Sequence, residues 1–230
     1  SDEPYLNANR ISPKKTPDPL MRSKLKRIMR DYQCWRILLE IITYPHPTLR
    51  HKSKPIKRVD AELREVVREM FKLMYEAKGV GLAANQVDLP IRLFVANLEA
   101  DPDKGEEMVF INPVVSMPKG TEENEEGCLS LPGLYGNVVR PKKVRINAYN
   151  MQGEEINADV EGLFSRVVQH ETDHLDGVLF IDRMTESAKI EVEGELDMFE
   201  TEFNSRRDTG GIPDNAAIAA RLSEWEAKYC

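Results

Sequence analysis

Apolar residues recur with helical spacing over residues 61–77, at intervals of three and four positions. They are Leu63, Val66, Val67, Met70, Met74 and Ala77. This period puts them on one face of a helix, so the pattern predicts an amphipathic helix packed against a core. Asp60 is expected to cap its start, and Gly79 is expected to end it.

Shorter apolar runs predict strands elsewhere. Three are expected, over residues 37–43, 91–96 and 108–115. Residues 143–149 and 154–160 alternate apolar with polar side chains on either side of a turn at 150–153. That arrangement predicts a β-hairpin.

The pattern becomes mostly helical again towards the C-terminus. Residues 186–206 predict an acidic helix with its apolar residues roughly on one side. Residues 217–229 predict a short final helix anchored by Leu222 and Trp225. Before these two helices, a short extended segment is expected at 178–181.

Composition narrows the class of protein. The 230 residues are 41% hydrophobic and 31% charged, which is ordinary for a globular chain, and a net charge of −7 argues against a general nucleic-acid binder. No apolar run approaches the roughly 20 residues that span a bilayer. Cys34, Cys128 and Cys230 form an odd, sparse set, which favours a reducing compartment.

Residues 1–36 differ from the rest, because they carry nine basic and four acidic residues. They have neither an apolar core nor a small-residue cleavage site, so they are not a signal peptide. Few serines and the presence of acids disfavour a transit peptide. We therefore expect a plain basic extension.

The highest density of potential metal-binding and catalytic side chains lies at residues 170–174, which have the sequence H-E-T-D-H. On a helix, His170 and His174 are stacked on one face about 40° apart and can hold one metal ion. Glu171 lies beside them, within reach of a water on that metal. Apolar residues precede the motif, so the helix is expected to be buried, and burying such polar groups without partners is costly.

Two histidines leave a catalytic metal one protein ligand short. The extended zincin pattern continues with a glycine, here Gly177, and then a third histidine, but that position is Phe180, which excludes this class. Cys128 is the better candidate, since a thiolate with two imidazoles suits zinc or ferrous iron. It lies in residues 125–133, which are expected to be irregular because they include Gly127 and Pro132.

Three stretches taken together resemble the signature motifs of peptide deformylase. They are residues 79–86 (GVGLAANQ), 126–130 (EGCLS) and 169–175 (QHETDHL), in that family's order and at compatible spacings. Residues 44–50 (YPHPTLR) resemble the family's opening segment. One departure is Asn85, where the family often has proline or threonine.

The resemblance covers roughly residues 37–185 and implies a domain organisation. We expect an α+β fold, with mixed or antiparallel sheets packed around a central buried helix that carries HExxH, and an additional C-terminal helix. Residues 37–185 would form the metallohydrolase domain. Residues 1–36 would be a basic N-terminal extension, and residues 186–230 an acidic C-terminal helix and tail.

The family implies a hydrolase that removes the N-formyl group from the N-terminal methionine of newly synthesised proteins. Cys128, His170 and His174 would hold one divalent metal per chain, with water in the open position. The metal would lower the pKa of that water. Glu171 would take its proton as general base and return it to the leaving amine as general acid.

Further roles follow from the same resemblance. With the metal, the Gln86 side chain and the Leu129 backbone N–H would stabilise the oxyanion. The peptide would lie as an extended strand along the backbone of the Gly-rich and Cys-containing stretches. Six residues are expected to bind it: Val80, Gly81, Gly127, Leu163, Arg166 and Val167. Behind the metal, Arg140 is expected to pair with Glu126.

The resemblance also implies cofactor, partners and location. Ferrous iron is expected in the cell, with zinc, nickel or cobalt as substitutes, and the substrates would be formyl-methionine nascent peptides. The ribosome would be a transient partner. We expect no direct nucleic-acid specificity, no membrane association, and a bacterial-type cytoplasmic location rather than organelle import. A monomer and a homodimer both remain open.

Two rival functions are considered. A zinc peptidase would use the same H-E-x-x-H, but Phe180 and the motif around Cys128 argue against it. A non-catalytic metal-bound module that docks on the ribosome or another partner would need neither Glu171 nor Gln86, because structural zinc sites are closed.

Overall fold

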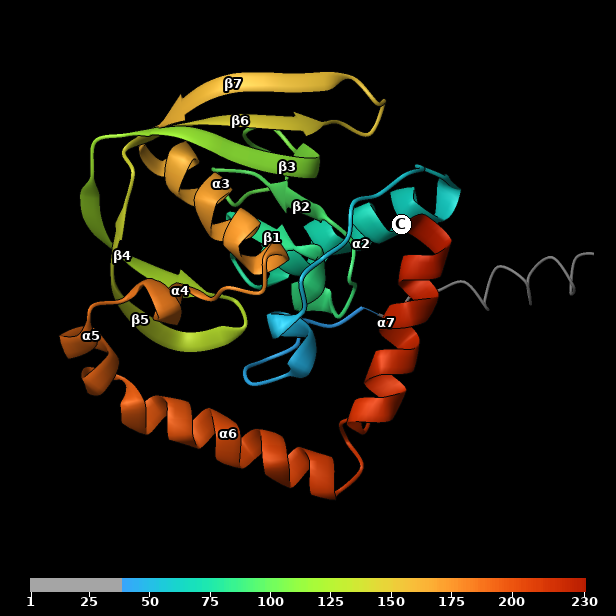
Figure 1. The fold of residues 1–230 in the computed structure, drawn as a ribbon, viewed down its shortest axis with the longest axis vertical. Coiled ribbons are helices and arrows are strands. Elements are labelled where there is room, and N and C mark those ends of the chain that lie inside the picture. Colours follow the sequence, from blue (N-terminus) through green and yellow to red (C-terminus); the bar gives the residue numbers. More distant parts are fainter. Residues whose placement is uncertain (1–38) are drawn as a thin grey trace, which may run out of the picture. The chain divides into compact units, whose positions relative to one another are not determined.

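Helix α3 lies between a five-stranded sheet and a two-stranded hairpin in the computed structural model, which describes residues 39–230 (Figure 1). The strands are β1 (Gly81–Ala83), β2 (Leu93–Ala96), β3 (Met108–Lys119), β4 (Glu122–Cys128), β5 (Leu131–Arg140), β6 (Lys143–Tyr149) and β7 (Glu155–Glu161). The helices are η1 (Pro47–Arg50), α2 (Ala61–Glu76), η2 (Ala84–Val87), α3 (Gly162–Leu175), α4 (Phe180–Arg183), α5 (Glu186–Glu191), α6 (Glu193–Asp208) and α7 (Asn215–Tyr229). The predicted α+β class is thus confirmed. The basic extension at 1–36 lies outside the described residues.

The larger sheet has the order β1-β2-β3-β6-β7, and every neighbouring pair of strands is antiparallel. Strands β6 and β7 form the predicted hairpin, in register from Lys143↔Glu161 to Tyr149↔Glu155. The predicted strands at 91–96 and 108–115 are present as β2 and β3. Strand β1 has a partner on one side only, so it is an edge strand.

Helix α2 forms as predicted, but it ends differently. The Asp60 carboxylate caps its start by accepting a hydrogen bond from Leu63 N–H at 2.9 Å. At the other end, Gly79 N–H donates to Met74 O at 2.8 Å and Lys78 N–H donates to Tyr75 O at 2.9 Å. This is the Schellman pattern, in which Lys78, with φ of 56°, takes the left-handed position expected of a glycine.

Helix α3 is buried because its apolar side chains pack into the core beneath the larger sheet. Val167 and Val168 belong to the same apolar cluster as Phe94 and Phe110. The rings of Phe94 and Phe110 stack with their centroids 4.6 Å apart. Anchored on this cluster, α3 runs between the larger sheet and the β4–β5 hairpin (Figure 1).

Four local predictions were wrong or incomplete. Residues 39–43 form no strand; instead, Ile42 N–H donates to Gln86 O in η2, and Tyr44 N–H donates to Ser130 O in the turn between β4 and β5. Residues 178–181 were expected to be extended, but Phe180 begins helix α4. The segment expected to be irregular, 125–133, lies mostly in the β4–β5 hairpin, where the register shifts between Gly127 and Cys128. Residues 186–206 form two helices, α5 and α6, interrupted at one residue.

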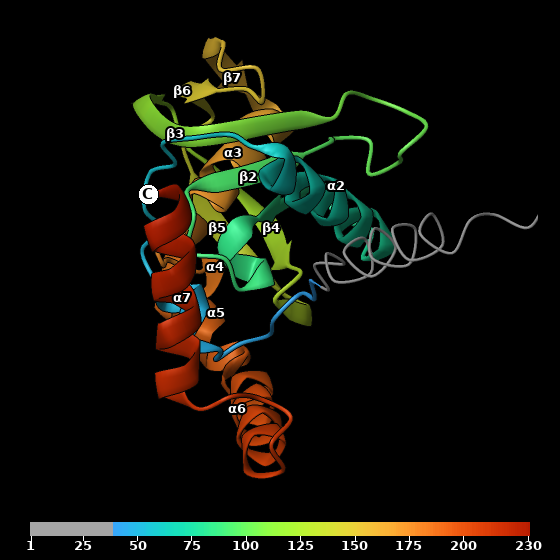
Figure 2. The same cartoon turned by 90° about the vertical axis from the view of Figure 1, so that its right-hand side faces the viewer.

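Helix α7 packs on the rest of residues 39–230 through Ile218, Leu222 and Tyr229, all of which are buried (red in Figure 2). Tyr229 OH donates to Asp60 Oδ1 at 3.0 Å, and Tyr229 O accepts from Lys57 N–H at 2.8 Å. The helix is therefore an integral layer rather than a loose tail. No helix among residues 39–230 is long and apolar enough to cross a bilayer.

Candidate metal centre and active site

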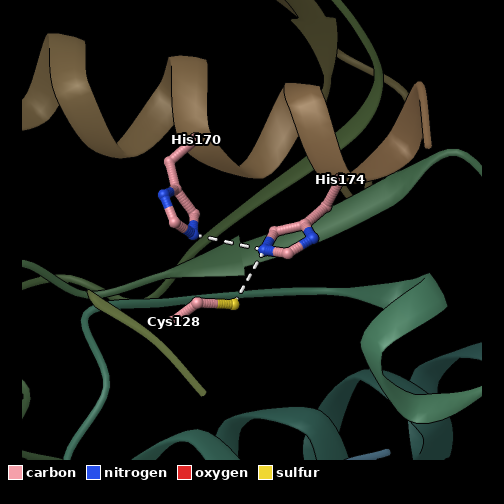
Figure 3. Close-up of side chains that lie close together, drawn as sticks. All are labelled: Cys128, His170 and His174. Carbon is pink, nitrogen blue, oxygen red and sulfur yellow. Dashed lines mark hydrogen bonds between the residues drawn. The ribbon is translucent and has the colours of Figure 1, made fainter. Parts of the chain in front are cut away.

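Three candidate ligand side chains face one another at the centre of the molecule. His170 and His174 project from the same side of α3 towards Cys128, which ends strand β4 (Figure 3). His174 Nε2 lies 3.2 Å from His170 Nε2 and 3.2 Å from Cys128 Sγ. All three donor atoms lie within 4.8 Å of one another.

These residues fit a divalent metal. A tetrahedral site with metal–nitrogen bonds of about 2.0–2.1 Å keeps two nitrogen ligands roughly 3.3 Å apart. The separation between the two histidine Nε2 atoms is close to that value. Burial is the main cause that keeps the pKa of His174 well below its usual range, so its ring is neutral, which is the form that binds metals.

His170 lies among negatively charged groups, and a bound cation would offset their charge. Burial lowers the pKa of His170, but its hydrogen bonds with Cys128 and Glu126 raise it more, to about 10. A metal ion would have to displace the proton from Nε2, and the same negative neighbours would then stabilise the bound cation.

Glu126 supports His170 from behind. Its Oε2 lies 2.9 Å from His170 Nδ1, and Arg140 donates to its two carboxylate oxygens at 2.6 and 3.0 Å. Arg166 donates to the same carboxylate at 2.5 Å. Burial raises the pKa of Glu126, but His170 and Arg140 lower it far more. The ionised carboxylate therefore accepts from Nδ1–H, which turns Nε2 towards Cys128.

Asp173 continues this network along α3. Arg140 donates to Asp173 at 2.6 Å, and so does Arg183. Asp173 lies between the two histidines in sequence. Two guanidinium groups therefore hold the turn of α3 that carries His170 and His174.

Glu171 is buried against the backbone of β1. Its side chain is 5% exposed, and its Oε2 has no hydrogen-bond partner among the described residues. A Cβ atom on Gly81 would lie 2.5 Å from Glu171 Oε1, so the glycine leaves the space that the carboxyl group occupies. Burial raises the pKa of Glu171 to about 7, which suits proton transfer near neutral pH.

Gln86 is held so that its amide nitrogen faces the ligand cluster. Its Oε1 accepts a hydrogen bond from Ala83 N–H at 2.8 Å, which fixes the orientation of the amide. Its Nε2 then lies 3.4 Å from Cys128 Sγ and 3.3 Å from Ser130 Oγ. Ile42 N–H donates to Gln86 O at 2.8 Å. Leu129 follows Cys128 directly, so its backbone N–H lies at the same cluster.

All six predicted substrate-binding residues line one cavity of about 640 Å³. They are Val80, Gly81, Gly127, Leu163, Arg166 and Val167. Gln86, Cys128, Leu129, His170 and Glu171 line the same cavity. Arg166 also ties the cavity wall to β4 and β5, because its guanidinium donates to Glu122 O and Val138 O.

Several residues at the site escaped the sequence analysis. Asn85, noted only as a departure, donates from its amide to His174 O. Ser130 and Asp173 lie inside the motifs already identified. Their polar side chains could have been recognised as site residues, because a buried polar side chain needs a partner. Arg183 and Tyr135, which also lines the cavity, had no local signal.

Phe180, which occupies the position of the third zincin histidine, packs against one of the candidate metal ligands. Phe180 starts α4, and its ring stacks on His170 at a centroid distance of 6.2 Å and an interplanar angle of 27°. It supplies an apolar wall beside the imidazole instead of a ligand atom. The three-ligand set of one cysteine and two histidines therefore differs from that of a zincin.

Known proteins match this chain over most of its length. A family model described as polypeptide deformylase matches residues 38–189. A peptide deformylase from Rhodopirellula baltica is 55% identical over 191 residues, covering 83% of this chain and 95% of that relative. Peptide deformylase 1B, chloroplastic/mitochondrial, from Arabidopsis thaliana is 37% identical over 225 residues, covering 93% of this chain and 79% of that relative.

Solved structures agree with the sequence matches. The crystal structure of a plant peptide deformylase has a TM-score of 0.73 at 40% identity and covers 78% of this chain and 97% of that chain. A Plasmodium falciparum peptide deformylase has a TM-score of 0.70 at 40% identity. The match covers 72% of this chain and 98% of the Plasmodium chain. The chain therefore belongs to the polypeptide deformylase family, whose members are hydrolases that remove the formyl group from the N-terminal methionine of new proteins.

Proposed function

We propose that Cys128, His170 and His174 hold the metal of this deformylase and that Glu171 moves the protons of the reaction. The observation that carries this proposal is the convergence of one sulfur and two nitrogen atoms within 4.8 Å, in the wall of a cavity that Glu171 also lines. A divalent metal bound there would make water acidic enough to supply hydroxide near neutral pH.

Glu171 acts as general base and then as general acid. Its carboxylate takes a proton from the attacking water and passes it to the amine of methionine as the C–N bond breaks, so formate and a free N-terminus are the products. Its buried position and its unpartnered Oε2 support this role. A carboxylate with other hydrogen-bond partners there would be a weaker base.

Gln86 and Leu129 stabilise the oxygen of the formyl group as it gains negative charge. The amide orientation fixed by Ala83 supports this assignment, because it turns the donor end of Gln86 towards Cys128. The Leu129 N–H would be the second donor. Each such donor contributes about 3–4 kcal/mol to the transition state in comparable sites.

The formyl-methionine peptide binds as an added strand between β1 and β4. The edge position of β1 supports this mode, because one side of that strand is not paired within the sheet. Gly81 and Gly127 line the cavity on the β1 and β4 sides respectively. The methionine side chain packs against Val80, Leu163, Val167 and the His170 ring.

Ferrous iron is the proposed metal in the cell, with zinc, nickel or cobalt as substitutes. The ligand set admits both iron and zinc, and the family membership favours iron. Purification without oxygen followed by metal analysis tests this assignment, and zinc at one equivalent per chain in that sample would contradict it. Oxygen exposure should inactivate the iron form, because the Cys128 thiolate is oxidisable.

The wider setting is also a proposal. We place the enzyme in the cytoplasm, where it meets nascent chains through transient contact with the ribosome, as a monomer or homodimer. Free thiols at Cys128 and Cys230 support a reducing compartment. Residues 37–185 are the proposed catalytic domain, flanked by the extension at 1–36 and the segment 186–230.

The ligand assignment is tested with Cys128→Ala. The variant should lose tightly bound metal and formate release together, because a two-histidine site is incomplete. Cys230→Ala is the matched control, since that thiol lies outside the cavity, and it should keep both. Full metal content in Cys128→Ala would show that the cysteine is not a ligand.

The reaction products distinguish deformylase activity from the two rival functions. Formate release from formyl-Met-Ala-Ser, with no cleavage of an acetyl-methionine or internal peptide bond, is the expected result. Cleavage of internal bonds without formate would favour a zinc peptidase. A metal bound by four protein ligands with no turnover would favour a docking module.

A further inference from the structure

We propose that Arg221, on the C-terminal helix α7, is a positioning residue for Gln86. It would act through the η2 turn, which carries that glutamine. The inference rests on the proposed role of Gln86 as an oxyanion donor. Arg221 lies beyond residues 38–189, the part of the chain that the family model matches.

The contact is direct and has two points. Arg221 Nη2 donates to Asp88 O at 3.0 Å, and the same guanidinium forms an ion pair with the Asp88 carboxylate. Asp88 ends η2, two residues after Gln86, and its N–H donates to Asn85 O at 3.2 Å. The guanidinium therefore holds both the main chain and the side chain of the residue that closes the turn.

The turn needs this support because Asp88 adopts an unfavourable backbone conformation. Its φ of 61° lies in the left-handed region, which residues other than glycine rarely adopt. Asp88 is also only 7% exposed, so its carboxylate needs charged or hydrogen-bonding partners. Arg221 supplies a charged partner, and Thr48 Oγ1 donates to the same carboxylate.

Helix α7, which carries the half-exposed Arg221 side chain, is well fixed. Ile218 and Leu222, three residues before it and one residue after it, are buried and dock α7. Near the end of the helix, Glu226 pairs with Lys54 at 2.6 Å and with His51 at 2.8 Å. A side chain between such anchors can hold η2 in place rather than follow its movement.

A shift of η2 would reach the reacting groups by two routes. The Gln86 amide would move relative to Cys128 Sγ, from which its Nε2 is now 3.4 Å away. Asn85, also in η2, donates to the carbonyl of His174. Because small displacements of catalytic donors are costly, loss of Arg221 should slow the chemical step more than it weakens peptide binding.

The test compares Arg221→Ala with Lys228→Ala in the holoenzyme. Lys228 pairs with Glu62 at the other end of α7, so its removal loosens the same helix without touching η2. We expect Arg221→Ala to lower kcat by about 3- to 10-fold, with KM and metal content unchanged. Lys228→Ala should keep the wild-type kcat. Equal losses of kcat in both variants would mean that only helix docking matters, and would overturn the proposal.

A double-mutant cycle links Arg221 to Gln86. In a Gln86→Ala background, Arg221→Ala should cause a much smaller loss of kcat, because the main donor that it positions is absent and only the Asn85 contact with His174 is still affected. Losses that multiply would show that Arg221 acts independently of Gln86. If Gln86→Ala keeps the wild-type kcat, the oxyanion role and the positioning proposal both fail. If only Arg221→Ala keeps it, the positioning proposal alone fails.

A second variant covers the case in which Arg221→Ala does not fold. Asp88→Asn keeps a side chain that tolerates the left-handed backbone but removes the charge that Arg221 holds. It should lower kcat in the same direction with KM unchanged. A wild-type kcat in Asp88→Asn would contradict the proposal.

Discussion

Gly81→Ala should displace Glu171 and slow the reaction about 100-fold. The added Cβ would lie 2.5 Å from Glu171 Oε1 and 2.9 Å from its Cδ, whereas ordinary contact begins at 3.4 Å. The carboxyl group must therefore retreat by about 0.9 Å, because β1 is buried along its whole length and cannot yield easily. A misplacement of about 1 Å costs roughly 10²-fold in rate, or about 2.7 kcal/mol of activation free energy.

The assay is steady-state formate release from formyl-Met-Ala-Ser, with metal content measured on the same sample. We expect the loss in kcat, with metal content unchanged, because the three atoms nearest to the added Cβ all belong to Glu171 rather than to a metal ligand. Gly194→Ala is the matched control, since a Cβ there meets nothing within 4 Å. A Gly81→Ala enzyme with the wild-type kcat would refute the assigned position of the base.

Two further predictions concern groups that support the site and the fold. Glu126→Gln should weaken metal binding by about 10- to 100-fold in chelator competition, because His170 loses its carboxylate partner. Asp60→Ala should lower the free energy of unfolding by about 1–2 kcal/mol at pH 7, since it removes the cap of α2 and the partner of Tyr229 OH. Burial raises the pKa of Asp60, but the bonds from Leu63 and Tyr229 lower it further, below its usual value. Its stabilisation is therefore present above the unfolded-state pKa and lost as pH falls through the folded-state pKa, so the two proteins should converge in acid.

Each of these predictions has its own control. Glu122→Gln changes an exposed glutamate on the same strand as Glu126, and it should leave metal affinity unchanged. For Asp60, denaturant unfolding is followed at neutral and acidic pH with the exposed Asp103→Ala as reference. Unchanged metal affinity in Glu126→Gln, or a stability difference for Asp60→Ala that is constant with pH, would contradict the respective argument.

Periodic segments could be predicted from the sequence because one physical cause dominates them. The apolar face of α2 and the alternation in the β6–β7 hairpin each reflect burial on one side of a regular element. The end of α2 was missed because the hydrogen-bond pattern of the last turn, rather than residue type, decides which residue becomes left-handed. That residue is Lys78, although Gly79 follows it.

Long-range partners explain two of the other errors. Residues 39–43 are apolar enough to resemble a strand, but Ile42 and Tyr44 donate to Gln86 in η2 and to Ser130 in the β4–β5 turn. The start of α4 depends on Asp182, which accepts from Leu179 N–H at 2.8 Å and pairs with Arg50. Neither partnership has a signal within a short window of sequence.

In the candidate site, too, some residues could be predicted from the sequence and others could not. Cys128, His170 and His174 could be named because metal chemistry demands a small set of residue types, and the structure brings them together. The ion pairs of Asp173 with Arg183 and of Asp88 with Arg221 could not be foreseen, since they join segments 10 and 133 residues apart. Such contacts depend on how the elements pack rather than on local pattern.

The most direct test of the central claim is formate release by Glu171→Gln, loaded with the same metal as the wild type. The variant keeps the shape of the side chain and leaves the ligands untouched, but it cannot accept the proton. We predict full metal content and a kcat lower by roughly 10²- to 10⁴-fold. A near-wild-type rate in the metal-loaded variant would show that another group transfers the proton, and would contradict the account.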